Sequence, residues 1–307
     1  MSSRQFTGAS TASMAIDVEN RTPSLTRDLL ELTKPGIITM CLASAAAGIG
    51  LAPGPVSVLL ILATFLGTAF AVGSANAFNM VLERDTDRLM ERTKNRPIAA
   101  GRLSPRTGVA LGLSLGVCGL TILAVAVNPL SALLAALALN TYVLLYTPLK
   151  RRSSIAMFLG AIPGAIPTLI GWTAVTGHIA LPGIVLFLVL VLWQMPHFLA
   201  IALYRKNDYQ KAGTRVVPLT HGDAAARTQA KIFTGLLLVV SLLLGPFGGV
   251  GWTYLAVAGG LGVWLLASAG RFLNAASAAS GARRFFFATL IYLPALIFGL
   301  VIDLVLR

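Results

Sequence analysis

Hydrophobic residues dominate nine stretches of the chain, and short polar stretches separate them. Most of these stretches approach the roughly 20 residues that an α-helix needs to cross the hydrocarbon core of a bilayer. The predicted helices span residues 36–52, 56–80, 107–127, 129–146, 154–175, 179–203, 232–250, 252–270 and 285–305. The pattern predicts an all-α integral membrane protein whose residues 29–307 form a single nine-helix transmembrane domain. Residues 1–28 are polar and rich in Ser and Thr, which predicts a flexible N-terminal tail.

Lys and Arg residues are distributed unevenly between the two sides of these predicted helices. The links after the first, third, fifth and seventh helices carry none of them. The N-terminal tail and the other links hold 23 of the 24 basic residues, and Arg307 alone lies on the opposite side. Positively charged links stay in the cytoplasm, so the basic side is predicted to be cytoplasmic. We therefore expect a multi-pass protein of the cell inner membrane, with a cytoplasmic N-terminus and an external C-terminus.

Composition favours the same class. Hydrophobic residues make up 56% of the 307 residues and charged residues 11%, which is typical of an integral membrane protein. The net charge of +13 would also be typical of a nucleic-acid-binding protein, but its one-sided distribution is explained by membrane topology. Membrane lipid is therefore an expected partner, and nucleic acid is not.

One charged stretch, residues 79–102, directly follows the second apolar segment and is predicted to lie at the membrane surface. On a helix, Asn79, Glu83 and Asp87 share one face because they are four residues apart, whereas Asp85 points elsewhere. One amide and two carboxylates form an oxygen-only ligand set that suits Mg²⁺ shared with substrate phosphates. Basic residues in the same stretch can donate hydrogen bonds to those phosphates. These residues are Arg88, Arg92, Lys94 and Arg96. The alternative is a solvated helix end of mixed charge.

A second long link on the basic side follows the sixth segment. Asp208 supplies a carboxylate there, and Arg205 and Lys206 supply cations at the same membrane level as the first cluster. Two such half-sites facing each other could clamp a diphosphate through Mg²⁺ while a lipid tail lies among the helices. Asp208 would then be a further metal ligand and catalytic residue. Its alternative role is to cap a helix or to pair with Arg205.

The end of the fourth segment offers a third group of candidates. Lys150 and Arg151 can reach a phosphate, and Tyr146 can face a developing carbocation because an aromatic ring attracts cations. The alternative is an interfacial tyrosine followed by ordinary cytoplasmic Lys and Arg.

Inside the sixth segment, Trp193 and His197 are candidates for substrate binding. An ionisable residue within a membrane span is a functional-site hypothesis by default, because its burial is costly. The alternative is structural: Pro196 leaves a backbone carbonyl free, and His197 could satisfy it.

Together these motifs resemble the protoheme IX farnesyltransferases (haem O synthases), a family within the UbiA-type superfamily of intramembrane prenyltransferases. The segments that carry the resemblance are Leu32–Pro35, Asn79–Pro97, Tyr146–Arg151, Gly164–Pro167, Gly171–Trp172, Pro196–Phe198 and Asp208–Gly213. The superfamily's second acidic motif is reduced here to Asp208, with Arg205 and Tyr209 where other branches carry acids. The resemblance implies nine helices around a central cavity that opens to the cytoplasmic side.

The resemblance also implies a reaction. Farnesyl diphosphate would bind through Mg²⁺ to Asn79, Glu83 and Asp87. The cations that neutralise the leaving group would be Arg96, Lys150 and Arg151. The 2-vinyl group of haem B would attack the allylic cation, and water would quench the resulting cation to give haem O and diphosphate.

Haem B is a substrate in this reaction rather than a cofactor. His197 is predicted to bind it through the iron or through a propionate, and Arg205 and Lys206 are the predicted propionate partners. Haem A synthase or cytochrome oxidase assembly proteins are implied as further partners.

Two other functions compete with this prediction. One is a prenyltransferase of the same superfamily that acts on a quinone precursor such as 4-hydroxybenzoate; the single acid of the second motif and His197 argue against it. The other is a transporter or channel. The acids of transporters usually lie near the membrane midplane, and here only Asp303 is an isolated acid within a predicted span.

Overall fold

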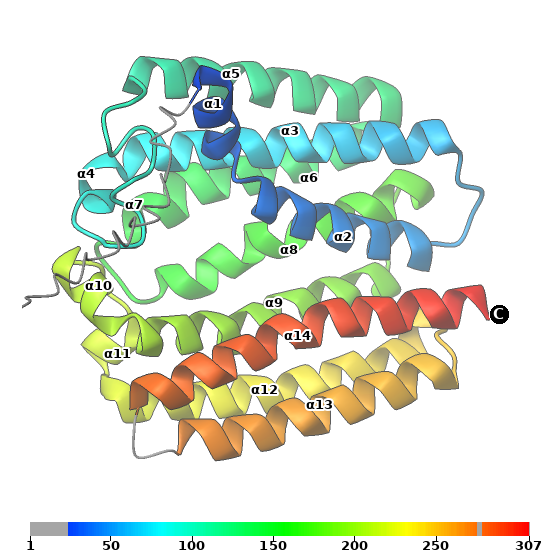
Figure 1. The fold of residues 1–307 in the computed structure, drawn as a ribbon. Coiled ribbons are helices and arrows are strands. Elements are labelled where there is room, and N and C mark those ends of the chain that lie inside the picture. Colours follow the sequence, from blue (N-terminus) through cyan, green and yellow to red (C-terminus); the bar gives the residue numbers. More distant parts are fainter. Residues whose placement is uncertain (1–23, 275–277, 307) are drawn as a thin grey trace, which may run out of the picture.

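The computed structural model describes residues 24–274 and 278–306, which form a bundle of long helices (Figure 1). Among these residues, eight helices are long and apolar enough to cross a membrane, and counting the bent pair α1 and α2 as one span gives a ninth. The spanning helices are α2 (Pro35–Leu51), α3 (Val58–Leu82), α5 (Pro105–Ile122) with the π-helix η1 (Leu123–Val127), α6 (Pro129–Asn140) with the π-helix η2 (Thr141–Tyr146) and α7 (Thr147–Leu149), α8 (Ala156–Thr176), α9 (Leu181–Tyr204), α12 (Gly222–Gly248), α13 (Trp252–Leu273) and α14 (Ala278–Val305). The prediction of an all-α membrane protein is confirmed.

Short helices complete the chain at one end of the bundle. They are α1 (Leu25–Thr33), α4 (Arg84–Asp87), α10 (Lys206–Lys211) and α11 (Val217–Thr220). Figure 1 places all four at the end where α3 finishes and α9 finishes. These short helices and their links therefore form a polar cover over one end of the apolar bundle.

Local capping signals explain several helix starts. Ser57, Ser104 and Asn128 precede α3, α5 and α6, and each side-chain oxygen accepts a hydrogen bond from the backbone N–H three residues on. Such caps satisfy backbone donors that a helix start leaves unpaired. Two predicted starts were too late, because α12 begins at residue 222 rather than 232 and α14 at residue 278 rather than 285. Arg227 and Arg283 interrupt the hydrophobic pattern there, but they do not end a helix that extends beyond the membrane surface.

The predicted N-terminal tail is also too long. Residues 1–23 lie outside the described residues, but α1 already begins at Leu25. Asp28 of α1 is buried, and Arg102 donates to both of its carboxylate oxygens at 3.0 and 3.1 Å. Arg102 also reaches Glu31 at 3.3 Å. These ion pairs dock α1 onto the link before α5, a long-range contact that the composition of the segment does not reveal.

Glycines bring α2 and α8 into backbone contact. A Cβ atom on Gly171 of α8 would collide with the backbone carbonyl of Ala45, and one on Gly48 of α2 would collide with the carbonyl of Thr168. Small residues at such crossings allow membrane helices to approach closely, which replaces the hydrophobic driving force that is absent in lipid. This contact fixes α2, which forms one wall of the cavity described below.

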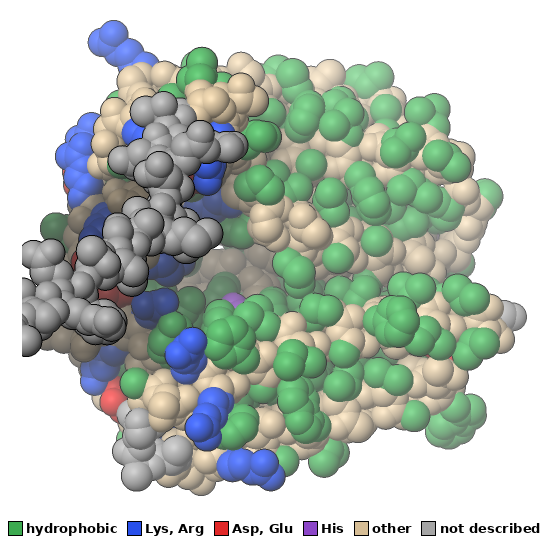
Figure 2. Space-filling model, in the orientation of Figure 1, with side chains coloured by type: hydrophobic (Ala, Val, Ile, Leu, Met, Phe, Trp, Pro, Cys, Tyr) green, Lys and Arg blue, Asp and Glu red, His purple; other side chains and the backbone are tan. Residues whose placement is uncertain are grey.

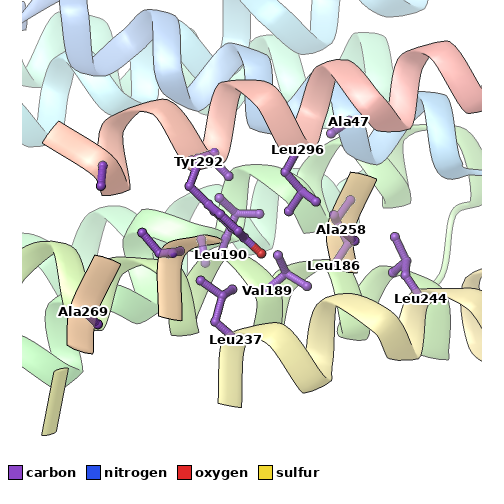
Figure 3. Close-up of a cluster of buried hydrophobic side chains, with 14 of the residues drawn as sticks. Ala47, Leu186, Val189, Leu190, Leu237, Leu244, Ala258, Ala269, Tyr292 and Leu296 are labelled. Carbon is purple, nitrogen blue, oxygen red and sulfur yellow. The ribbon is translucent and has the colours of Figure 1, made fainter. Parts of the chain in front are cut away.

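The largest hydrophobic core lies on the other side of the bundle, among α9, α12, α13 and α14. Tyr292 of α14 is fully buried within it, and its ring points away from α14 towards Val189 of α9 (Figure 3). Its hydroxyl lies 3.0 Å from the hydroxyl of Ser241, so the one polar atom of the ring has a partner. The core fixes α9 and α14 relative to each other, and these two helices form a second wall of the cavity.

The Lys and Arg side chains of the described residues gather at one end of the molecule. Figure 2 shows Lys and Arg side chains towards the left end, over the short helices and the adjoining ends of α13 and α14, while hydrophobic side chains are spread over the rest of this face. The C-terminal end of α14 lies at the opposite end (Figure 1). The arrangement matches the one-sided charge distribution of the sequence and confirms a multi-pass membrane protein.

The isolated intramembrane acid has a structural role. Asp303 is buried, and its two carboxylate oxygens accept hydrogen bonds from the backbone N–H groups of Gly251 at 2.8 Å and Tyr254 at 3.2 Å. These groups form the N-terminus of α13, where a negative charge is stabilised by the helix dipole. Asp303 therefore caps a neighbouring helix, which gives this isolated acid a structural role.

Candidate active site

A cavity of about 460 Å³ lies at the charged end of the bundle. Its walls come from α2, α3, η2, α8, α9 and α14, so residues far apart in the chain meet there. Figure 2 shows the molecule hollowed on this face, between the helices of its upper and lower halves. Nine of the predicted site residues line the cavity, namely Asn79, Glu83, Asp87, Arg92, Arg96, Tyr146, Lys150, Trp193 and His197.

The three predicted oxygen ligands meet at the charged end of this cavity. Asn79 lies in the last turn of α3, Glu83 follows α3 directly, and Asp87 ends α4. Asn79 and Asp87 are only 1% and 2% exposed, yet both contribute to the cavity wall. Asp85, predicted to point elsewhere, is exposed and pairs with Arg84 at 3.0 Å. Asn79, Glu83 and Asp87, which helical spacing predicts on one face, therefore meet at one end of the cavity.

Each of these three side chains accepts a hydrogen bond from a lysine or an arginine side chain. Lys34 donates to Asn79 Oδ1 at 2.8 Å, and Lys150 donates to Glu83 Oε1 at 2.8 Å. Arg96 donates to both carboxylate oxygens of Asp87, at 2.9 and 2.8 Å. The two acids of the cluster are thus each paired with a cation, which their burial requires.

The pair of Glu83 and Lys150 stays ionised. Burial by itself would raise the pKa of Glu83, but the charge and the hydrogen bond of Lys150 outweigh it and hold that pKa below its usual value. Burial likewise would lower the pKa of Lys150, but the charge of Glu83 and the neighbouring tyrosines together outweigh it and raise that pKa well above its usual value. A carboxylate and an ammonium ion are therefore both present at neutral pH, as metal and phosphate binding require.

Two tyrosines face the cavity beside this charged cluster. The rings of Tyr142 and Tyr146 in η2 lie 5.1 Å apart, and the ammonium of Lys150 lies 5.4 Å from the centre of the Tyr146 ring. Gly160 of α8 leaves the space that the Tyr146 ring occupies, since a Cβ there would collide with it. The aromatic rings therefore stand between the charged end and the apolar interior.

A narrower apolar cavity of about 80 Å³ continues from this point. It shares four wall residues with the main cavity, namely Ile37, Cys41, Tyr142 and Gly164. It then runs between α2, α3, α6 and α8 past Ala75 and Ala138, towards Ala71 and Ala135. We refer to it below as the apolar arm. It begins beside the aromatic rings and gives an apolar chain a path away from the charged cluster.

Trp193 and His197 of α9 line the main cavity on its opposite side. Their rings are stacked with centres 5.0 Å apart, and the ring of Phe286 on α14 lies 4.8 Å from that of His197. His197 Nδ1 lies 2.9 Å from the hydroxyl of Thr289 on α14. Its hydrogen bond therefore crosses to a neighbouring helix, so the alternative that His197 satisfies the carbonyl freed by Pro196 is not what the structure shows.

Five predicted site residues do not line the cavity. Lys94 pairs with Glu91 at 2.6 Å, Lys206 pairs with Asp223 at 2.7 Å, and Arg205 lies 4.4 Å from the centre of the Tyr204 ring. The others are Arg151, which hydrogen-bonds to Thr86, and Asp208, which has Arg205 3.9 Å away.

The change of direction between α9 and α10 explains why Arg205 and Asp208 do not line the cavity. Tyr209, Thr214 and Arg215 line the cavity in place of Arg205 and Asp208, because the chain turns directly after α9. One carboxylate oxygen of Asp208 is buried with no hydrogen-bond partner among the described residues. The sequence places these residues near the membrane surface, but it does not give the direction of a six-residue helix.

Lys34 is a site residue that the sequence argument missed. It separates α1 from α2 and adopts φ 53° and ψ 72°, the left-handed region, where it is the only residue other than glycine among those described. Pro35 follows it, and a residue before proline is kept out of the right-handed helical region. Leu32–Pro35 is one of the segments that carry the family resemblance, so this motif was the available signal.

These features define the class of protein. Acids and cations at the mouth of a cavity, with an aromatic boundary and an apolar arm inside a membrane bundle, suit an enzyme that handles a diphosphate with a lipid tail. The UbiA prenyltransferase family profile matches residues 41–291, and the chain belongs to that family. It is an intramembrane prenyltransferase, as the sequence predicted.

Relatives narrow the comparison. A protoheme IX farnesyltransferase of Myxococcus xanthus is 44% identical over 292 residues, which cover 93% of this chain and 97% of that protein. The protein of the same name from Sorangium cellulosum is 48% identical over 238 residues, 78% of this chain and 85% of that protein. A third, from an Anaeromyxobacter strain, is 44% identical over 278 residues, 89% of this chain and 92% of that protein.

Solved structures share the fold at low sequence identity. A digeranylgeranylglyceryl phosphate synthase has a TM-score of 0.78 at 16% identity, covering 92% of this chain and 99% of that one. A UbiA homologue from Archaeoglobus fulgidus, solved with DMAPP and Mg²⁺, has a TM-score of 0.66 at 15% identity, covering 90% of this chain and 99% of that one. The bundle described above is therefore the UbiA fold.

Proposed function

We propose that this prenyltransferase carries out the reaction of the protoheme IX farnesyltransferases. It transfers the farnesyl group of farnesyl diphosphate to the 2-vinyl group of haem B, and water addition completes haem O. The identity of 44–48% to relatives of that name, over most of the chain, carries this proposal. The cavity supports it, because one cavity holds a diphosphate-binding end, an apolar arm and a histidine.

The residues at the charged end fit Mg²⁺. One amide oxygen and two carboxylates are hard oxygen ligands, and Asn79, Glu83 and Asp87 present them to one cavity. No group of three or more His, Cys, Asp and Glu side chains that could hold a metal occurs among the described residues. The set of Asn79, Glu83 and Asp87 supplies few protein ligands, which suits Mg²⁺, because this ion keeps waters and takes substrate phosphates as ligands. When bound, Mg²⁺ would neutralise the charge that develops on the diphosphate. Asp208 as a further ligand stays a prediction.

Cations of the site would bind the diphosphate directly. Lys34, Lys150 and Arg96 already hold the three oxygen ligands, so their charged groups lie where a diphosphate would arrive. Arg92 lines the same cavity and is exposed. These groups stabilise the negative charge of the leaving diphosphate, which lowers the barrier to breaking its bond to the farnesyl carbon.

The apolar arm would hold the farnesyl chain. Tyr142 and Tyr146 stand at its mouth, so their rings would face the allylic carbon when the diphosphate leaves. An aromatic face attracts a cation, and the apolar surroundings exclude the water that would otherwise give farnesol. The bond to the terminal carbon of the haem vinyl group then forms. Water adds to the inner vinyl carbon and loses a proton.

Filling the far end of the apolar arm should shorten the chain that the enzyme accepts. Ala135 of α6 is buried and lines this end. In Ala135→Leu we expect transfer from farnesyl diphosphate to fall by about tenfold or more, because a poor fit costs about 1–3 kcal/mol. Transfer from geranyl diphosphate should be retained. The measurement is kcat/KM for both donors.

Ala124→Leu is the matched control, because Ala124 lies exposed on the lipid-facing side of the bundle. It should leave both donors unaffected. Equal losses for the two donors in Ala135→Leu would contradict this placement of the chain.

Haem propionates need cations at the cavity rim. Arg215 lines the cavity, whereas Lys206 is held by Asp223 outside it. We therefore expect Arg215→Gln to raise the KM for haem B by about tenfold, since a charge-assisted hydrogen bond contributes about 1.5–3 kcal/mol. The KM for farnesyl diphosphate should change little. Lys206→Gln is the comparison, and a haem-specific defect there instead of in Arg215→Gln would restore the sequence-based assignment.

We also propose an orientation. The charged end of the bundle faces the cytoplasm of the cell inner membrane, so the N-terminus is cytoplasmic and the C-terminus external. The charge asymmetry supports it. Haem A synthase or cytochrome oxidase assembly proteins as partners stay a prediction.

Reporter fusions test this orientation. Fusions after Leu51 and Val127, which end α2 and η1, should report an external position. Fusions after Arg102 and Lys211 should report a cytoplasmic one. A cytoplasmic signal at Val127 would contradict the proposal.

The experiment that tests the function uses purified protein with haem B, farnesyl diphosphate and Mg²⁺. Mass spectrometry should detect haem O, and diphosphate should be released in equal amount. A parallel reaction with 4-hydroxybenzoate should give no prenylated product. Prenylated hydroxybenzoate without haem O would identify the enzyme as a quinone-precursor prenyltransferase instead.

A further inference from the structure

Thr289 on α14 contacts Trp193 and His197, two of the α9 residues that line the main cavity. Its backbone carbonyl accepts a hydrogen bond from Trp193 Nε1 at 2.8 Å. Its hydroxyl oxygen lies 2.9 Å from His197 Nδ1 and 2.6 Å from the backbone carbonyl oxygen of Phe286. Thr289 is fully buried, so these contacts lie away from water.

The two contacts of this hydroxyl decide which ring nitrogen of His197 carries a proton. A carbonyl oxygen can only accept, so two oxygens 2.6 Å apart need the hydroxyl proton between them. The hydroxyl has one proton, and that proton is then committed to Phe286. Its oxygen therefore accepts from His197, which must donate through Nδ1–H. A neutral imidazole carries one ring proton, so Nε2 keeps its lone pair.

The ring is also held in orientation. Trp193 stacks on one side at 5.0 Å between ring centres, and the Phe286 ring lies 4.8 Å away. His197 contributes to the wall of the main cavity. The hydrogen bond among the described residues that involves this ring uses Nδ1, so Nε2 is the nitrogen left to bind a ligand.

We propose that Thr289 is a positioning residue that holds His197 as the Nδ1–H tautomer, so that Nε2 binds the iron of the haem substrate. This inference rests on the proposed function. A hydrogen bond donated by the ring nitrogen that does not bind the metal fixes the tautomer of a metal-binding histidine and raises the basicity of the other nitrogen. Binding through the iron holds the macrocycle in place, so its vinyl group meets the allylic carbon at the mouth of the apolar arm.

Two variants separate the hydroxyl from the rest of the side chain. Thr289→Val keeps the shape and removes the hydroxyl, whereas Thr289→Ser keeps the hydroxyl. The probes are ferric protoporphyrin IX and metal-free protoporphyrin IX, titrated into the purified full-length protein. We expect Thr289→Val to weaken ferric binding by about tenfold or more, which is typical for loss of an outer hydrogen bond to a metal ligand. Metal-free binding should be unchanged, and Thr289→Ser should match the unmodified protein.

Resonance Raman spectra of the ferrous complex give a second readout. The unmodified protein should show an iron–histidine stretching band that His197→Ala lacks and that Thr289→Val shifts to lower frequency. Thermal unfolding of each variant checks its fold. If Thr289→Val does not fold, the band of the unmodified protein and its loss in His197→Ala still test the ligand. No iron–histidine band in the unmodified protein would overturn the proposal, as would equal ferric binding by Thr289→Val.

The same preparation is assayed for haem O, which separates the two proposals. Haem O formation without an iron–histidine band would overturn the role of His197 and Thr289 and leave the proposed reaction standing. An iron–histidine band that shifts in Thr289→Val, without haem O formation, would support their role in binding the iron and contradict the proposed reaction.

Discussion

Asp87→Asn should reduce prenyl transfer by about a thousandfold or more, with insertion into the membrane unaffected. Asp87 is buried at the charged end of the cavity, where Arg96 holds both of its oxygens. The amide keeps the shape but loses the charge that a divalent cation and its diphosphate need. Losing one ligand of such a clamp is expected to cost about 4 kcal/mol of transition-state stabilisation. The measurement is kcat in the haem O assay, with Mg²⁺ titrated for each variant.

Asp85→Asn is the matched control. It makes the same chemical change two residues away, on a side chain that is exposed and paired with Arg84. Water screens surface ion pairs of this kind and they contribute little, so activity should stay within a few-fold of the unmodified protein. Similar, mild losses in Asp85→Asn and Asp87→Asn would show that the acids are only a solvated helix end. Glu83→Gln should reduce prenyl transfer as strongly as Asp87→Asn does, because Glu83 lines the same cavity.

Gly171→Ala should destabilise the protein strongly although it adds a single methyl group. The new Cβ would collide with the backbone carbonyl of Ala45, and backbone cannot rotate away as a side chain can. Overpacking usually costs about 1–3 kcal/mol, and a backbone clash lies at the upper end of that range or beyond. Separation of α2 from α8 would also move Ile37 and Cys41, which line both cavities. We expect a lower unfolding temperature in detergent and loss of haem O formation together.

Gly235→Ala provides the comparison within a membrane helix. A Cβ on Gly235 of α12 would meet nothing within 4 Å. Alanine is about 1 kcal/mol more favourable than glycine inside a helix, so stability should be equal or slightly higher. An unchanged unfolding temperature for Gly171→Ala would mean that α2 and α8 are not in close contact, and the cavity wall described here would be wrong.

The charged cluster could be predicted largely from the sequence. Asn79, Glu83 and Asp87 share a helix face by spacing alone, and the structure brings all three to one cavity. The basic residues that contact them were harder to predict. Lys34 lies 45 residues from Asn79 in the chain, and Lys150 lies 67 residues from Glu83. Spacing describes neighbours on one helix, whereas these ion pairs depend on how helices pack.

The link after α9 could not be predicted in the same way. Arg205, Lys206 and Asp208 were predicted from their position after the sixth span, but the α10 turn presents Tyr209 and Arg215 to the cavity instead. A short helix after a span has no long hydrophobic face to fix its rotation. Its orientation depends on contacts such as the pair of Lys206 and Asp223, 17 residues apart.

The sequence by itself determined the membrane class, the approximate positions of the spans, the charged side and the family. Hydrophobic run length, charge asymmetry and short motifs are local properties, and lipid imposes them directly on the chain. Only the tertiary structure decided which cations hold the acids, where the apolar arm runs and which nitrogen of His197 is free. The reason is physical: Thr289 lies 92 residues from His197, and the contact exists because α9 and α14 pack against each other around Tyr292.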